Sequence, residues 1–117
     1  MDVTEKIAFI KTHDPDGAAR LERLIGKREN LVSEGNVYKE KFTERQFSLV
    51  FNPLLDATYE RARILETLSG GDSTIPAISE KIGLSREKVF AAIKDLMRKN
   101  LVEIAHHQER DATFRKK

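Results

Sequence analysis

The sequence contains no cysteine. This absence excludes disulfides, iron–sulfur clusters, zinc sites with thiolate ligands and cysteine nucleophiles. No apolar run approaches the roughly 20 residues that cross a bilayer, and the opening MDVTEKIAFIKTHD lacks the basic start and apolar stretch of a secretory signal. We therefore expect a cytoplasmic protein without a membrane-bound part.

Motifs of catalysis and metal binding are also missing. The sequence has no GxSxG and no HExxH, and GKRE at Gly26 lacks the upstream glycine and the following Ser or Thr of a phosphate-binding loop. His106 and His107 are adjacent, and neighbours in a strand point to opposite faces, so the two imidazoles would diverge from a shared ion. We predict no enzyme activity, no metal site and no cofactor.

Charge is distributed unevenly along the chain. The 117 residues carry a formal net charge of +2, and 34% of them are charged. Up to Asn52 there are nine basic and nine acidic residues, whereas from Ser85 onward there are nine basic and five acidic. The positive surplus therefore lies in the last third of the chain, as contacts with nucleic-acid phosphates require.

Proline, glycine and helix-capping residues in the C-terminal half predict three helices and a hairpin. Asn52-Pro53 is typical of a helix start, and Gly70-Gly71 would end that helix after Ser69. After the extended Thr74-Ile75, Pro76 opens a short second helix that stops at Gly83. Ser85 then caps a third helix up to about Asn100. Beyond it, LVEIAHH, a polar QERDA and TFRKK indicate two strands around a tip.

The stretch ARILETLSGGDSTIPAISEKIGLSREKVFAAIKDLMRKNLVEI resembles the winged helix-turn-helix core of small prokaryotic repressors of the arsenical-repressor and multiple-antibiotic-repressor types. The resemblance covers about half of the chain. It implies a DNA-binding transcriptional regulator, usually a homodimer, with the third helix in the major groove of duplex DNA and the hairpin, or wing, on the backbone. The matching positions are Ile64, Leu65, Leu68, Thr74, Ile78, Glu80, Gly83-Leu84-Ser85, Val89, Ile93, Leu96 and Leu101-Val102.

Carried over to this sequence, the resemblance places the DNA contacts on the third helix and the hairpin. Arg86 would address guanine or a phosphate, and Ala91 or Ala92 a thymine methyl. The interleaved Glu87 and Asp95 leave open that this helix surface is only solvated. The predicted nucleic-acid-binding residues are Ser85, Arg86, Lys88, Ala91, Ala92, Lys94, Arg110, Arg115 and Lys116.

Phe90 and Met97 are unusual for a DNA-reading helix. Relatives usually place polar or basic residues where Phe90, Ala91 and Ala92 stand. Phe90 and Met97 lie two turns apart and widen the apolar stripe of the helix. Either the N-terminal segment packs over them, or they anchor a partner protein. The second possibility supports an alternative function, a protein-interaction module or accessory subunit of a larger complex without DNA binding.

Residues 1–52 predict a mostly helical extension, which could pack on the winged domain of residues 53–117 or mediate dimerisation. Asp14-Pro15-Asp16 is typical of a helix start. An apolar stripe follows, and a later cluster could be helix or strand; either could supply a dimer interface. The opening apolar residues are equally ambiguous. The stripe consists of Leu21, Leu24, Ile25, Leu31 and Val32. The later cluster consists of Phe42, Phe47, Leu49, Val50 and Phe51, and the opening apolar residues are Val3, Ile7, Phe9 and Ile10.

Overall fold

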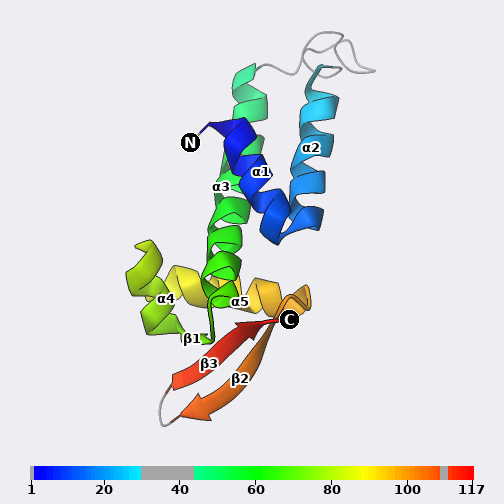
Figure 1. The fold of residues 1–117 in the computed structure, drawn as a ribbon. Helices are drawn as coiled ribbons and strands as arrows, with labels where there is room; N and C mark the ends of the chain where they lie inside the picture. The colour runs from blue at the N-terminus through cyan, green and yellow to red at the C-terminus, as the bar shows by residue number, and fades with distance from the viewer. Residues whose placement is uncertain (1, 30–43, 109–110) are drawn as a thin grey trace. The chain divides into compact units, whose positions relative to one another are not determined.

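The computed structural model describes residues 2–29, 44–108 and 111–117, which form five helices and three strands (Figure 1). They divide into two compact units, Met1–Tyr59 and Glu60–Lys117, called here the N-terminal and C-terminal units. The predicted fold class, mainly helical with a small β hairpin, is confirmed. The sequence predicts a boundary after residue 52, whereas the chain divides into these units after Tyr59. None of the described helices combines the length and apolar character that a membrane span requires.

Asp14 joins the first two helices, α1 (Val3–His13) and α2 (Pro15–Glu29). Its backbone N–H donates to the Ile10 carbonyl at 2.6 Å and ends α1. Its carboxylate Oδ1 accepts a hydrogen bond from the Gly17 amide at 3.1 Å, which satisfies a free donor in the first turn of α2. Pro15 loses nothing at the first helical position, where its missing N–H would have no partner. The helix start predicted at Asp14-Pro15 is therefore confirmed.

The predicted helix start at Asn52-Pro53 is wrong. The helix α3 runs from Glu44 to Ser69 and contains Pro53 in its interior. Proline removes one hydrogen bond to the carbonyl four residues earlier. Phe47, Phe51 and Leu55 nevertheless continue the helical period across it and are all buried. Their packing outweighs the lost bond, so the described part of the apolar cluster, from Phe47 to Phe51, is helical and not a strand.

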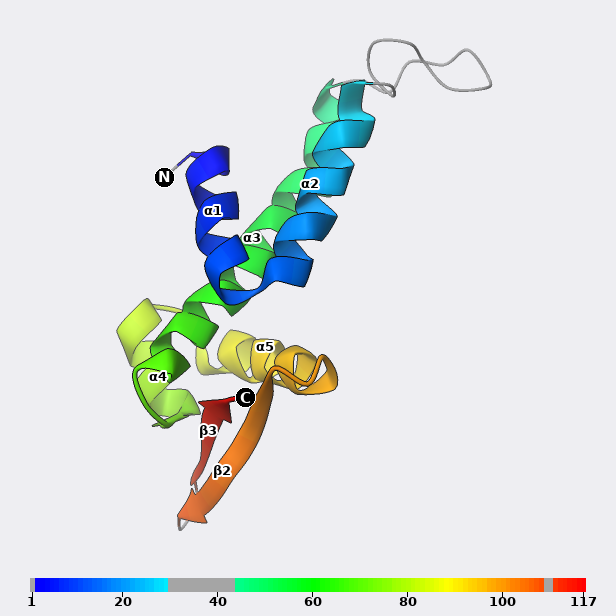
Figure 2. The same ribbon diagram turned by 45° about the vertical axis from the view of Figure 1, so that its right-hand side comes forward.

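The N-terminal unit packs α1 and α2 alongside residues 44–59 of α3 (Figure 2). The Phe9 ring on α1 meets Tyr59 edge-on at 5.4 Å between centroids, and the Arg28 guanidinium on α2 lies 5.6 Å from the Phe47 ring. Leu21 of the predicted stripe on α2 is fully buried. The other members of that stripe are half-buried (Leu24 and Ile25) or outside the described residues (Leu31 and Val32), as is Phe42.

The C-terminal unit consists of the end of α3 followed by β1 (Ser73–Thr74), α4 (Ile75–Ile82), α5 (Arg86–Arg98), β2 (Val102–Gln108) and β3 (Asp111–Lys116). Gly83 ends α4 in the left-handed region at φ 74°, which glycine adopts without steric cost. The Ser85 hydroxyl accepts a hydrogen bond from the Lys88 amide at 3.2 Å and starts α5. The predicted helix, glycine turn, helix and hairpin are all present.

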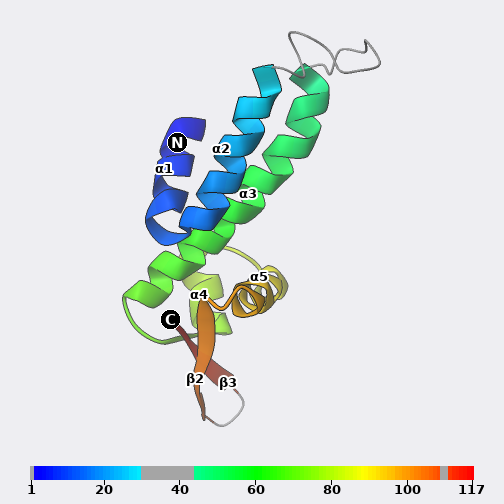
Figure 3. The same cartoon turned by 90° about the vertical axis from the view of Figure 1, so that its right-hand side faces the viewer.

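The strands form one antiparallel sheet in the order β1-β3-β2. Phe114 on β3 is opposite Ser73 on β1 and Ile104 on β2, and a bulge follows between Ile104 and His106. The hairpin extends away from α4 and α5 (Figure 3). The core of the unit is apolar and draws on all its helices and on the inner end of the hairpin: Ile64, Leu65, Leu68, Ile78, Ile82, Val89, Ile93, Leu96, Val102 and Phe114.

Candidate nucleic-acid interface

The helix α5 has one buried face and one exposed face. Val89, Ile93 and Leu96 repeat at intervals of three and four residues and are buried against the core. The Ser85 cap fixes where the helix begins, and therefore which residues face outward. The outward side carries a mixture of cations, an acid and apolar residues.

Most of the predicted contact residues on α5 are accessible. Ser85, Arg86, Lys88, Ala91 and Lys94 are exposed. Ala92 differs, since it is half-buried and packs against the core of the C-terminal unit. Its position on the helix follows Val89 by three residues, which returns it toward the buried face. Ala91, one residue earlier, is the alanine that remains available to a ligand.

The cationic side chains of α5 differ in whether they contact neighbouring side chains. Arg98 contacts Asp95 at 3.4 Å, and the Lys94 ammonium lies 5.3 Å from the centre of the Phe90 ring. Among the described side chains, neither Arg86 nor Lys88 forms an ion pair. Arg86 and Lys88, near the N-terminus of α5, are thus the cations of this helix with the least competition for a phosphate.

On the hairpin, the predicted phosphate contacts are more constrained. The Arg115 Nε lies 2.7 Å from Glu103 Oε1 on the facing strand. The hydrogen bond from Arg115 holds the pKa of Glu103 below its usual value, and the same bond raises the pKa of Arg115. Lys116 is half-buried, and Arg110 lies outside the described residues. The charge of Arg115 is therefore offset in part by the neighbouring Glu103 carboxylate.

A shallow groove of about 360 Å³ borders the N-terminal end of α5. It is lined by Ile75 and Pro76 from α4, by Arg86, Glu87 and Phe90 from α5, and by Asp111 from β3. Phe90 is 52% exposed, so its ring forms an apolar wall of this groove. The sequence alone does not indicate that Ile75, Pro76 and Asp111 line one groove. They lie on two elements, α4 and β3, and no periodic pattern marks residues that meet only after folding.

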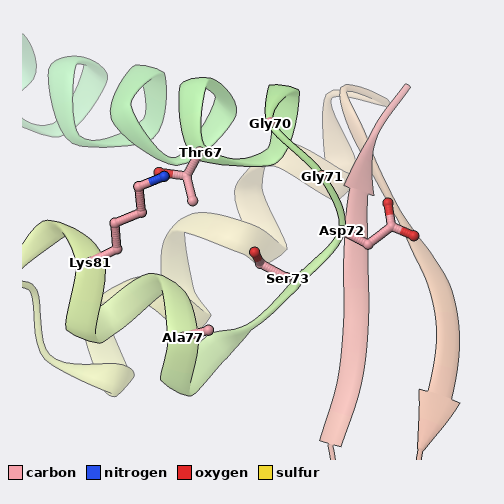
Figure 4. A pocket seen from close by; sticks show the side chains of 7 residues that line it. All are labelled: Thr67, Gly70, Gly71, Asp72, Ser73, Ala77 and Lys81. Atoms are coloured by element: carbon pink, nitrogen blue, oxygen red, sulfur yellow. The ribbon is translucent and has the colours of Figure 1, made fainter.

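A second hollow, of about 190 Å³, lies between the end of α3, the following loop and α4 (Figure 4). The Lys81 side chain extends from α4 toward Thr67 on α3. The Gly70 and Gly71 amides donate to the carbonyls of Thr67 and Leu68, both at 3.2 Å. Because these backbone donors are already used, the glycine pair does not form a phosphate-binding cradle.

The two adjacent histidines on β2 are exposed. His106 Nδ1 lies 3.2 Å from the Thr113 hydroxyl across the hairpin. Within residues 2–29, 44–108 and 111–117, no group of three histidine, aspartate or glutamate side chains is placed to hold a metal ion.

No protein-family model, no curated protein and no solved structure matches the chain.

Proposed function

We propose that this protein is a DNA-binding transcriptional regulator of the cytoplasm, whose C-terminal unit acts as a winged helix-turn-helix domain. The observation that carries the proposal is the outward display of Arg86, Lys88 and Ala91 at the beginning of α5. Their exposure follows directly from the Gly83 turn and the Ser85 cap. The first turns of the second helix are the part of such motifs that meets base edges.

In the proposed complex, α5 occupies the major groove of duplex DNA. Arg86 contacts guanine or a phosphate, Ala91 contacts a thymine methyl, and Lys88 and Lys94 contact phosphates. The Ser85 hydroxyl oxygen caps the helix, and its hydrogen remains available to a phosphate oxygen. The hairpin, with Arg110, Arg115 and Lys116, follows the backbone. A homodimer would place two such units on a two-fold operator.

The test is a titration of random duplex DNA at two salt concentrations with the parent and with Arg86→Glu. An acidic residue in the first turn of a helix is favourable, so the substitution should leave α5 folded. We expect a steep dependence of affinity on salt in the parent and a loss of about tenfold or more in Arg86→Glu. Arg23→Glu, an exposed site on α2, is the matched control. A parent that ignores DNA at low salt would exclude the proposal.

The exposed Phe90 favours a second candidate function, binding of a partner protein. Phe90 is 52% exposed and Met97 38%, and Phe90 lines the groove with Ile75 and Pro76. An exposed aromatic ring beside an apolar wall is typical of an interface anchor. For such a module, which does not bind DNA, Phe90→Ser should leave folding intact but abolish co-purification with a host protein. If instead it weakens DNA binding as strongly as Arg86→Glu, Phe90 belongs to the DNA interface.

A further inference from the structure

The N-terminal unit has an apolar surface on α3 that the described residues 2–29 and 44–59 leave exposed. Leu49 is 68% exposed and Val50 59%, the two highest values among the large hydrophobic residues that the structure describes. At 100° per residue, Leu49 and Pro53 lie on one side of the helix, opposite the buried Phe47 and Phe51. Val50 flanks this stripe.

Opposite charges stand at the two ends of this stripe. Arg45 lies one turn before Leu49, and Asp56 lies one turn after Pro53; both are exposed. We call the five residues Arg45, Leu49, Val50, Pro53 and Asp56 the α3 outer face. Asp56 is 3.8 Å from Lys6, but its side chain is 64% exposed, which leaves the carboxylate open to a second cation.

We propose that the α3 outer face binds the same face of a second copy of this chain, with the two α3 helices antiparallel. A two-fold contact pairs residue i with j and j with i. In the antiparallel arrangement Arg45 of each copy meets Asp56 of the other, while Leu49 meets Pro53. A parallel arrangement would bring arginine against arginine and aspartate against aspartate. The order of the charges along the α3 outer face therefore favours a second copy of the chain as the partner, and the antiparallel orientation of the two helices.

Burial removes two residues from the dimer interface that the sequence predicts. The cluster that includes Phe47 and Phe51 was a candidate as a whole, but both rings are buried and stack on each other at 5.1 Å. They stabilise the N-terminal unit itself. Leu49 and Val50 remain to supply the apolar contact.

The proposal is tested on the full chain without DNA, by sedimentation equilibrium over a range of concentrations. We expect the parent to form a reversible dimer. Arg45→Asp and Asp56→Arg should each weaken the dimer about tenfold, because each places like charges together twice. The double variant, Arg45→Asp with Asp56→Arg, restores both pairs and should recover association to within about threefold of the parent.

Arg23→Asp on α2, outside the face, is the control for charge reversal and should associate like the parent. Circular dichroism of each variant separates lost association from lost folding. A monomeric parent, or a folded double variant that fails to recover, overturns the proposal. Because no DNA is present, this outcome is independent of the proposed regulator function.

Discussion

Arg115 on β3 and Glu103 on β2 face each other in register, with 2.7 Å between the arginine Nε and the carboxylate Oε1. The pair lies on the face of the hairpin away from Phe114, since alternate residues of a strand point to opposite sides. It joins a predicted phosphate ligand to an acid that opposes phosphate binding. The ion pair, which the register of the hairpin sets, should therefore weaken the proposed contact between Arg115 and DNA.

Removing the carboxylate should strengthen DNA binding. Glu103→Gln keeps the shape of the side chain and frees the Arg115 charge for a phosphate. If the hairpin contacts the backbone, affinity rises, and the slope of log affinity against log salt steepens by about 0.9 per added phosphate contact. Glu22→Gln, which removes an exposed acid on α2, is the control. Equal affinities and slopes for both variants would place the hairpin outside the interface.

The same pair predicts a difference in acid stability. Because the hydrogen bond from Arg115 depresses the pKa of Glu103 in the folded protein, its stabilising effect is present above the unfolded-state pKa. That effect is lost as the pH falls through the lower, folded-state pKa. The melting temperature of the parent should therefore fall more than that of Glu103→Gln as pH is lowered through the acidic range. Thermal melts of both proteins at matched pH and salt measure the difference, and parallel curves would contradict it.

The neighbouring alanines of α5 should respond differently to lysine. Ala91 is exposed, so Ala91→Lys should change the free energy of unfolding by no more than about 0.5 kcal/mol and tighten DNA binding. Ala92 packs against the core, so Ala92→Lys should destabilise the protein by about 1–3 kcal/mol. Urea unfolding followed by DNA titration measures both effects. Similar stabilities would mean that the two side chains share one face.

Two glycines of α2 offer a second matched pair. A Cβ at Gly17 would overlap Asp14 Oδ2 and lie 2.9 Å from Thr58 Cγ2, so Gly17→Ala should destabilise the N-terminal unit by about 1–3 kcal/mol. A Cβ at Gly26 would meet no atom within 4 Å. Gly26→Ala should stabilise the helix by about 0.5–1 kcal/mol. Urea denaturation measures the free energy of unfolding of both variants. A stabilising effect of Gly17→Ala would contradict the tight packing around Asp14.

Local signals predicted the elements of the C-terminal unit well. Gly83 and Ser85 act on their immediate neighbours, so their effects on α4 and α5 can be derived from sequence alone. The start of α3 was not predictable in this way. There, tertiary packing of Phe47, Phe51 and Leu55 overrides the local signal of Pro53.

The candidate interface was only partly predictable, for the same physical reason. The exposure of Arg86 and Lys88 follows from helical period and the capping residue. The pairing of Arg115 with Glu103 depends on the register between strands, and the groove beside Phe90 depends on three elements meeting. A count of charges in the sequence cannot distinguish an arginine in an ion pair, such as Arg115, from one that forms none with the described side chains, such as Arg86.

The bulge between Ile104 and His106 separates two parts of the hairpin that tolerate change differently. On the inner side, Phe114 is held between Ser73 and Ile104 and is buried, so its register must be preserved. From His106 outward, the side chains on β2 are solvated wherever the structure describes them. Libraries that vary this outer part, while the inner pairing is kept, should therefore give new hairpin surfaces without unfolding the protein.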